Sequence, residues 1–574
     1  MNHFQKCRTV LKELYDNQEL VNCTILTEDG GVFKVHIEIL AGISPYFKRI
    51  VTNSRDTPWD NIYLPNVSKE IMANIINYIY TGDLCLALDK VNALCRAAEM
   101  LQMPSIIQLC KTFLLMKLNN ETCVSIYMFA KYFQYEDLKD KARSYIMAHF
   151  QEIFPTSADF LNLEADDLVT ILSSDNLNVK SEHLVFSAVN RWVDSEPQMR
   201  AVYLPSLLRC IRLALLDYQF YETNIWSNPH ISTNEECQSI LYQASQVFAE
   251  MNNGDPRQSL FDLHHPFLRP RIPYEIIFVM GGWSAGSATN IMETLDVKSE
   301  RWYLALIADS VPRAYHGMLW HQSKIYVIGG FDGNQCFNSV RRFDPVTHIW
   351  EERGCMHVQR CYVSVAKVDD YIYAMGGYDG HRRNKSCERY NPESNQWSYI
   401  SNMNHIRSDA SADSLDGKIY IAGGFNGSQV LESAECYDPE TDEWTLITTM
   451  NSPRSGVKLV AYCDVLYVIG GFNGNNRLAT VEKYDLRAKM WFPVASMNGP
   501  RSNFATAVIN GHLYVIGGFN GLSTISTVEY YDCQTNNWEN APDLNLNRSA
   551  LAACSVSGIS TASEYSFHGN VPQP

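Results

Sequence analysis

A pair of adjacent glycines recurs six times in the second half of the chain, each time at the end of a short apolar run such as IYVI at residues 325–328. The pairs begin at Gly281, Gly329, Gly376, Gly423, Gly470 and Gly517. One spacing is therefore 48 residues and the other four are 47. Glycine adopts backbone angles that other residues avoid, and it lets a second backbone come close. A period near 50 with short strands predicts the blades of a β-propeller.

Three further markers keep the same phase as the glycine pairs. Each unit has a tryptophan 21 residues after its first glycine: Trp302, Trp350, Trp397, Trp444, Trp491 and Trp538. A large side chain stands 14 residues after that glycine: Leu295, Phe343, Tyr390, Tyr437, Tyr484 and Tyr531. An arginine recurs every 47 residues: Arg313, Arg360, Arg407, Arg454, Arg501 and Arg548. We interpret these arginines as structural residues that tie strand ends together by hydrogen bonds.

One unit divides into four short runs rich in β-branched or aromatic residues, at 360–367, 371–377, 386–392 and 396–400. Turn formers separate the runs, so they are predicted to be strands. Four strands cannot bury both faces of a sheet alone, but six sheets stacked around an axis can.

The phase of the repeat predicts how the ring closes. The first glycine pair has no arginine-led strand before it, and the last such strand, at residues 548–556, has no glycine pair after it. We therefore predict that the C-terminal strand completes the first blade and closes an all-β, six-bladed propeller over residues 274–560. Closure removes the exposed strand edges that promote aggregation. Residues 561–574 are expected to form a disordered tail.

The first half of the chain changes pattern near residue 116. Residues 1–115 combine a predicted hairpin with helical periodicity, which indicates an α/β domain. Residues 116–252 have leucines and aromatics three and four apart, which predicts an all-α domain. Residues 253–273 are rich in Gly, Pro and Asn and are predicted to be a linker.

Composition excludes several classes of protein. The formal net charge is −16, without a basic run, so a nucleic-acid partner is not expected. No apolar segment has the roughly 20 residues needed to cross a bilayer, so no membrane partner is expected. The first twenty residues lack the apolar centre of a signal peptide, and we expect a cytoplasmic protein. The sixteen cysteines lack zinc-ligand spacing, so we expect reduced thiols, no metal and no cofactor.

Three segments carry a resemblance to known domains. VHIEILAGISPYF at residues 35–47 and IYTG at 79–82 resemble the BTB signature. Residues 160–193 resemble the BACK domain, and the six units resemble Kelch repeats. The chain is thus similar to the BTB-BACK-Kelch (kelch-like) family, whose members are adaptors of cullin-type ubiquitin ligases.

The resemblance implies a non-enzymatic adaptor. The α/β BTB domain would form a homodimer and, with the all-α BACK domain, hold cullin-3, while the propeller would hold a protein substrate. A ubiquitin-loaded enzyme on the cullin would then reach the substrate, which is catalysis by proximity. MGGWSAGSATN, PRAYHG and RRFDPV resemble a germ-cell member of the family, which implies a role in sperm development.

The resemblance also implies substrate contacts on one propeller face. The aromatic residue after each glycine pair is one set: Trp283, Phe331, Tyr378, Phe425, Phe472 and Phe519. The alternative for these aromatics is packing between blades, and both remain open. Residues just after the repeated arginine form a second set: Ser408, Ser455, Ser502 and Ser549, with Tyr315 and Tyr362 in the units that lack serine. Basic residues seven positions after the first glycine form a third set: Arg383 and Arg477.

In the BTB part, the resemblance implies cullin contacts around Phe47 and Tyr80. The family often has an apolar-x-Glu motif here, whereas this chain has Arg55-Asp56-Thr57, a departure that concerns the strength of cullin binding. Arg55 and Asp56 are therefore included among the candidate cullin contacts. His36 is expected to be a buried structural histidine.

Three other functions are compatible with parts of the sequence. Residues 282–286 fit GxSxG, but the hydrolase elbow needs a following helix, whereas a turn and a strand are predicted here. A dimeric propeller could also cross-link actin as a cytoskeletal scaffold, and this remains the main alternative. A transcriptional corepressor is the third, and the lack of zinc fingers or a basic segment argues against it.

Overall fold

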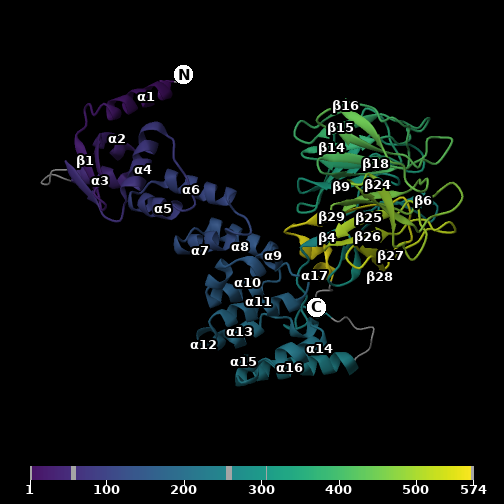
Figure 1. The fold of residues 1–574 in the computed structure, drawn as a ribbon, viewed down its shortest axis with the longest axis horizontal. Coiled ribbons are helices and arrows are strands. Elements are labelled where there is room, and N and C mark those ends of the chain that lie inside the picture. The colour runs from purple at the N-terminus through teal and green to yellow at the C-terminus, as the bar shows by residue number, and fades with distance from the viewer. Residues whose placement is uncertain (1–2, 54–59, 254–260, 306, 571–574) are drawn as a thin grey trace. The chain divides into compact units, whose positions relative to one another are not determined.

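The structure is a computed structural model that describes residues 3–53, 60–253, 261–305 and 307–570 (Figure 1). Contacts divide the chain into two compact units. One unit comprises Met1–Ile171 with Ser187–Tyr203, and the other comprises Leu172–Phe186 with Leu204–Pro574.

The first unit begins with an α/β domain. Its three-stranded sheet has the order β2-β1-β3, in which β1 pairs antiparallel with β2 and parallel with β3. The strands are β1 (Cys23–Thr27), β2 (Val32–Val35) and β3 (Asn61–Leu64). The helices are α1 (His3–Asp16), α2 (Ile37–Ile43), α3 (Pro45–Asn53), α4 (Lys69–Thr81), α5 (Val91–Met100) and α6 (Pro104–Met116). The predicted hairpin is β1 and β2, and the α/β class is confirmed.

A series of helices follows, and the predicted all-α class is confirmed. The principal helices are α7 (Cys123–Tyr132), α8 (Glu136–Ala148), α9 (Phe150–Thr156), α10 (Ala165–Ser173), α11 (Glu182–Ser195), α12 (Pro197–Arg200), α13 (Leu204–Leu208), α14 (Tyr218–Phe220), α15 (Pro229–Ser232) and α16 (Glu235–Asn253). None of the helices among the described residues is long and apolar enough to span a membrane.

The second unit contains six four-stranded antiparallel sheets, which are the blades of a propeller. Blade 1 is formed by β29 (Ala552–Ser557), β4 (Glu275–Met280), β7 (Met292–Asp296) and β8 (Arg301–Leu304). Blade 2 is formed by β9 (Gly317–His321), β10 (Lys324–Ile328), β11 (Val340–Asp344) and β12 (Ile349–Arg353). Blade 3 is formed by β13 (Ser364–Val368), β14 (Tyr371–Met375), β15 (Cys387–Asn391) and β16 (Gln396–Ile400).

The other three blades repeat the pattern. Blade 4 is formed by β17 (Ser411–Leu415), β18 (Lys418–Ala422), β19 (Ala434–Asp438) and β20 (Glu443–Ile447). Blade 5 is formed by β21 (Lys458–Tyr462), β22 (Val465–Ile469), β23 (Val481–Asp485) and β24 (Met490–Val494). Blade 6 is formed by β25 (Ala505–Ile509), β26 (His512–Ile516), β27 (Val528–Asp532) and β28 (Asn537–Ala541).

The ring closes as predicted. The C-terminal strand β29 pairs antiparallel with β4, from Ala552 opposite Met280 to Ser557 opposite Glu275, and so becomes the innermost strand of blade 1 (Figure 1). Each innermost strand contacts its neighbours, and the last contacts, β25 with β29 and β29 with β9, complete the circle.

The glycine pairs allow a close backbone contact between neighbouring blades. Gly329 has φ +63°, in the left-handed region. A Cβ atom there would lie 2.2 Å from the carbonyl oxygen of Arg360, in the next blade. That oxygen accepts a 2.8 Å hydrogen bond from the backbone N–H of Gly330. A side chain at Gly329 would therefore force adjacent blades apart.

The prediction of a disordered tail is wrong for residues 561–570. This segment forms a short 3₁₀ helix, Ala562–Tyr565, and the helix α17 (Phe567–Asn570). Tyr565 and Phe567 are buried, and the Tyr565 hydroxyl donates a 2.9 Å hydrogen bond to the carbonyl oxygen of Pro345. The segment is ordered because Tyr565 and Ala562 fill the wedge between the first two blades.

Candidate functional site

The repeated arginines are buried ion-pair partners, which confirms their structural interpretation. Arg360 Nη1 donates a 2.6 Å hydrogen bond to the carbonyl oxygen of Gly376, and Nη2 lies 2.9 Å from Oε1 of Glu388 on β15. Both side chains are fully buried. Four other blades repeat the pair: Arg407 with Glu435, Arg454 with Glu482, Arg501 with Glu529, and Arg548 with Glu293. Each pair ties the start of an inner strand to the third strand of the same blade.

Blade 2 departs from this pattern. Arg341 occupies the position where the other blades have glutamate. The buried carboxylate of Asp309 replaces that glutamate, and its oxygens lie 3.1 Å from Arg341 Nη2 and 4.0 Å from Arg313 Nε. The glutamates were missed by the sequence analysis, although the four in blades 3 to 6 recur 47 residues apart like the other markers.

A closed ring of backbone hydrogen bonds joins all six blades at one end of the channel. The second residue after each repeated arginine has a left-handed backbone, with φ between 52° and 58°. The N–H of each donates to the carbonyl oxygen of its counterpart in the preceding blade, over 2.7–3.1 Å. In order around the axis, the ring residues are Tyr315, Tyr362, Asp409, Gly456, Asn503 and Ala550. We call the end of the channel that they surround the mouth.

Side chains of four ring residues face one another at the mouth. The rings of Tyr315 and Tyr362, both predicted contacts, have centroids 4.0 Å apart. Asn503 Nδ2 donates a 2.7 Å hydrogen bond to Asp409 Oδ1, and these two residues lie two blades apart. Asp409 and Asn503 were missed, because their importance depends on a backbone conformation that residue type alone does not reveal.

The six predicted aromatics lie around the mouth and are half-buried: Trp283, Phe331, Tyr378, Phe425, Phe472 and Phe519. Each forms a β-bridge with the residue that follows the repeated arginine of its own blade, as Phe425 does with Ser408. Part of each ring packs against protein and part faces solvent, so packing and partner contact are compatible roles.

The four predicted serines are buried, with at most 8% of their surface exposed: Ser408, Ser455, Ser502 and Ser549. Ser408 Oγ donates to the carbonyl oxygen of Phe425 and accepts a 3.0 Å hydrogen bond from Arg383 Nε. The prediction that these serines contact a partner directly is therefore corrected. Ser408 instead helps to hold Phe425 and Arg383 in place.

The two predicted arginines lie between aromatics of adjacent blades. The guanidinium carbon of Arg383 is 5.3 Å from the ring centre of Tyr378 and 4.6 Å from that of Phe425. Arg477 is 4.4 Å and 4.9 Å from the ring centres of Phe472 and Phe519. Stacking of this kind fixes the planar guanidinium and leaves its edge free to pair with a carboxylate or phosphate.

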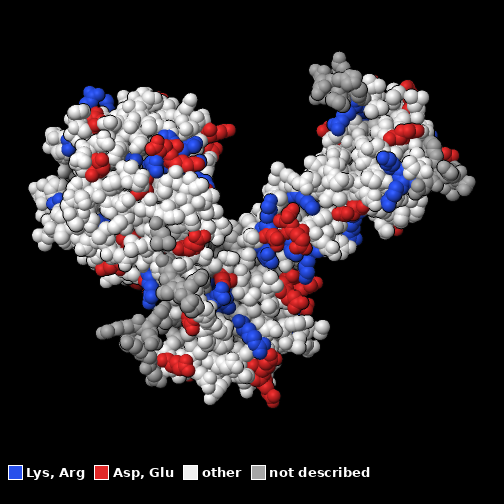
Figure 2. Space-filling view, turned by 180° about the vertical axis from the view of Figure 1, so that it is seen from behind, with Lys and Arg blue, Asp and Glu red and all other residues white. Residues whose placement is uncertain are grey.

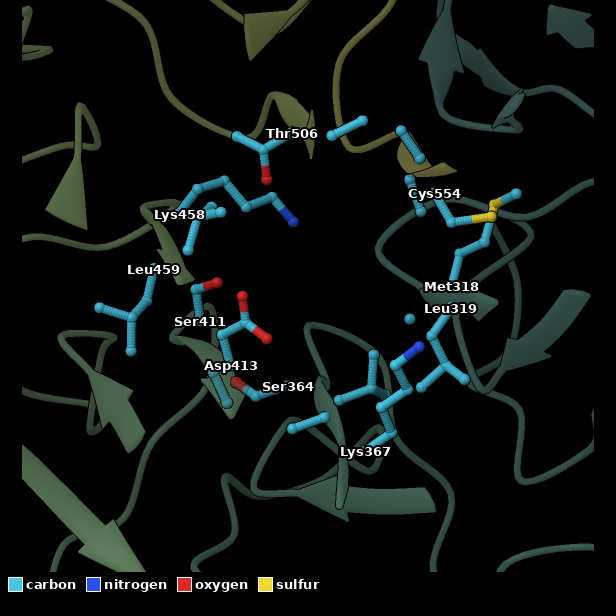
Figure 3. Close-up of a pocket in the computed structure, with 18 of the residues that line it drawn as sticks. Met318, Leu319, Ser364, Lys367, Ser411, Asp413, Lys458, Leu459, Thr506 and Cys554 are labelled. Atoms are coloured by element: carbon cyan, nitrogen blue, oxygen red, sulfur yellow. The ribbon is translucent and has the colours of Figure 1, made fainter. Parts of the chain in front are cut away.

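The channel below the mouth has a volume of about 510 Å³. Lys367, Asp413 and Lys458, from the inner strands of three successive blades, point into it (Figure 3). Among the described residues, no group of three or more His, Cys, Asp or Glu side chains is arranged to hold a metal ion.

The GxSxG segment does not form a hydrolase elbow. Trp283–Ser284 and Ser287–Ala288 are the two strands, β5 and β6, of a small hairpin. No helix follows Ser284, whereas the elbow places its serine between a strand and a helix.

Two of the four predicted cullin contacts, Phe47 and Tyr80, lie in the interior of the BTB part. Phe47 is fully buried and Tyr80 is 1% exposed, so neither side chain can reach a partner. The Tyr80 hydroxyl lies 2.7 Å from His36 Nδ1, and His36 Nε2 lies 2.9 Å from the carbonyl oxygen of Glu19. His36 is thus a buried structural histidine, as predicted. Arg55 and Asp56 lie outside the described residues.

Comparison with known families now identifies the chain. The BTB/POZ domain family matches residues 11–118, and the BACK family, "BTB And C-terminal Kelch", matches residues 123–225. The "KLHDC2/KLHL20/DRC7 Kelch-repeats domain" matches residues 274–456 and 416–567, which together exceed half of the chain. The chain belongs to the BTB-BACK-Kelch family.

Individual proteins of similar sequence support this assignment to the BTB-BACK-Kelch family. Kelch-like protein 3 of Homo sapiens, of Bos taurus and of Mus musculus is each 31% identical over 336 residues. The match covers 58% of this chain and 56% of each relative, so the chain spans little more than half the length of the curated relatives it matches. The likeness of three segments to the germ-cell member, Kelch-like protein 10, stays a prediction.

Charges of both signs are mixed on the surface of this BTB-BACK-Kelch protein. On the face shown in Figure 2, Lys and Arg side chains are interspersed with Asp and Glu, and the described residues form no continuous basic patch there.

The carboxyl group of Asp409, at the mouth, makes the stability of this propeller depend on pH. Burial raises the pKa of Asp409 to about 6, against the opposing effects of Asn503, Lys458 and Arg383. The hydroxyls of Tyr315 and Tyr362 also lie within electrostatic range. A carboxyl whose pKa is raised on folding stabilises the fold below its unfolded pKa and loses that contribution as the pH rises through the folded value.

Asp409→Asn is therefore expected to raise the free energy of unfolding by roughly 2–3 kcal/mol at pH 8, and to have little effect at pH 4. Asp416→Asn is the matched control, because Asp416 is exposed and also has a left-handed backbone. That control should change stability by less than about 0.5 kcal/mol. Denaturant unfolding at both pH values measures the difference, and an equal gain at pH 4 and pH 8 would contradict the assignment.

Proposed function

We propose that the chain is the substrate-recognition adaptor of a cullin-3 ubiquitin ligase. In this proposal the BTB domain forms a homodimer and binds the cullin together with the BACK helices, and the propeller mouth binds a cytoplasmic protein substrate. Membership of the BTB-BACK-Kelch family supports the proposal. The observation that carries it is the mouth itself, where six half-exposed aromatics and two stacked arginines converge at the end of the channel.

The chain itself would perform no chemistry. A ubiquitin-loaded enzyme on the cullin would be held near the substrate, which raises the effective concentration of the reacting groups. A symmetric dimer presents two mouths, so a substrate with two weak motifs would bind more tightly through avidity. The likeness to a germ-cell member supports sperm development as the setting.

The substrate segment is proposed to be acidic or phosphorylated. Arg383 and Arg477 lie on blades 3 and 5, each with its guanidinium held between two aromatic rings. A guanidinium fixed in this way can donate two parallel hydrogen bonds to a carboxylate or phosphate. The surrounding aromatics would cover the apolar residues that flank the charge.

Charge reversal tests this substrate class. Arg383→Glu and Arg477→Glu should each weaken substrate capture about tenfold or more, and together abolish it, because each replaces an attraction with a repulsion. Cullin-3 capture by the same variants should stay unchanged. Co-purified proteins, quantified by mass spectrometry from cells expressing each variant, provide both readouts.

Arg382→Glu is the matched control, because the Arg382 side chain is 83% exposed and immediately precedes Arg383. It changes the net charge equally without altering a stacked arginine, and should leave substrate capture intact. If the double variant captured the same proteins as the unmodified chain, the acidic-substrate proposal would be wrong.

A further inference from the structure

Two cysteines from adjacent blades meet at the end of the propeller opposite the mouth. Cys463 lies in the turn between β21 and β22 of blade 5, and Cys533 directly follows β27 of blade 6. Their sulfur atoms are 2.6 Å apart, although 70 residues separate them in the sequence. Cys463 is exposed and Cys533 is half-buried. The pair is therefore both preformed and accessible to small molecules.

Tyr462 holds the two thiols in register. Its hydroxyl donates a 2.6 Å hydrogen bond to the carbonyl oxygen of Gly511 in blade 6, and it accepts one of 3.3 Å from the backbone N–H of Cys533. The same tyrosine is the residue before Cys463, so the turn bearing one thiol is tied directly to the backbone bearing the other. Hydrogen bonds between blades 5 and 6 thus hold the two sulfur atoms close together.

We propose that Cys463 and Cys533 are an oxidation site, at which a low-molecular-weight disulfide such as oxidised glutathione produces a reversible disulfide between blades 5 and 6. The sulfur atoms need to approach by only about 0.5 Å to reach the bond length of about 2.05 Å. The site therefore requires little rearrangement of either blade.

The chemistry is thiol–disulfide exchange in two steps. The Cys463 thiolate attacks one sulfur of oxidised glutathione, which forms a mixed disulfide and releases one glutathione thiolate. The Cys533 thiolate then attacks the Cys463 sulfur of the mixed disulfide and releases the second glutathione. The two protons of the cysteines end on the two glutathione molecules, and the protein loses two electrons while oxidised glutathione gains them. Partial desolvation and the contact with Cys533 raise the pKa of Cys463 to about 11, so the first step should accelerate as the pH rises.

A second thiol pair provides a comparison within the same propeller. Cys336 and Cys361 lie at the mouth, with their sulfur atoms 3.0 Å apart. They occupy the positions that Arg383 and Ser408 hold one blade further on. Both are buried, whereas Cys463 is exposed. Oxidised glutathione cannot reach either buried sulfur and should therefore spare this pair, although its geometry is similar.

The disulfide should stabilise the ring, because a cross-link between distant residues reduces the conformational entropy of the unfolded chain. For a closed loop of this length, the expected rise in Tm is on the order of 5 °C or more. The bond would also oppose separation of blades 5 and 6.

The test treats the full chain with oxidised glutathione at pH 8, unfolds it in guanidinium with iodoacetamide to block the remaining thiols, and maps the peptides by mass spectrometry. We expect one new cross-linked peptide pair, containing Cys463 and Cys533 and lighter by two hydrogen atoms, while Cys336 and Cys361 are alkylated. Tm should rise, and dithiothreitol should reverse both changes.

Two variants complete the test. Cys533→Ser should stop the reaction at the mixed disulfide, with glutathione on Cys463 and no rise in Tm. Cys361→Ser should form the cross-link as the unmodified chain does. The proposal is overturned if Cys463 and Cys533 of the unmodified chain are both found alkylated after treatment. It is also overturned if Cys463 forms a disulfide with a cysteine other than Cys533.

Discussion

A chain that ends after Asn547 will lack a folded propeller rather than a slightly shortened one. The truncation removes β29, which supplies the innermost strand of blade 1 and all of its hydrogen bonds to β4. It also removes Arg548 and leaves the carboxylate of Glu293 buried without its partner. Residues from β29 belong to the apolar clusters on both sides of blade 1, so two interblade contacts are lost together.

The combined loss should exceed the roughly 5–15 kcal/mol by which a folded domain is stable. Calorimetry of the truncated protein should therefore show no cooperative transition of the propeller. A chain that ends after Asn570 is the control, because it keeps every described residue of the propeller and should melt like the full chain. If the chain that ends after Asn547 melted like the full chain, β29 would not be what closes the ring.

Replacing one buried arginine should have the second largest effect. Arg407→Met is expected to lower the free energy of unfolding by about 3–5 kcal/mol, because it leaves Glu435 as a buried charge without a cation. Arg382→Met, at an exposed arginine, should cost less than about 0.5 kcal/mol. Urea denaturation of the three proteins measures the difference.

A second substitution separates charge from packing. Adding Glu435→Gln to Arg407→Met removes the unpaired charge and keeps one oxygen, which can accept the hydrogen bond that Glu435 Oε2 accepts from the backbone N–H of Asn404. The double variant should therefore recover part of the lost stability. If the two substitutions were additive, the ion pair would not be the origin of the effect.

The architecture could be predicted from the sequence because it depends on repetition. Glycine pairs, tryptophans and arginines recurring every 47 or 48 residues require six equivalent units, and the phase of the last arginine-led strand requires closure through the C-terminus. The glutamates that pair with the arginines show the same period, so the sequence also contained that information. Arg341 is the one break in their series, and the fold brings Asp309 to the place of the missing glutamate.

The candidate site could be predicted only in part, because recurrence does not reveal which side chains reach the surface. Ser408 and its counterparts recur in every unit that has a serine there, but they are buried. Tyr80 is also buried, and its hydroxyl lies beside His36 instead of facing a partner. The roles of Asp409 and Asn503 depend on a left-handed backbone and on side chains two blades apart. The ordered end of the chain depends on a wedge that exists only after the ring has closed.

The central claim is that this chain joins a cullin to a client held at the propeller mouth. Affinity purification of the full chain from cells, followed by quantitative mass spectrometry with and without an inhibitor of the ligase, tests it most directly. We expect cullin-3 in both samples, and protein substrates whose amounts increase when the ligase is inhibited. A purification rich in actin and free of cullin would contradict the claim and favour a cytoskeletal scaffold.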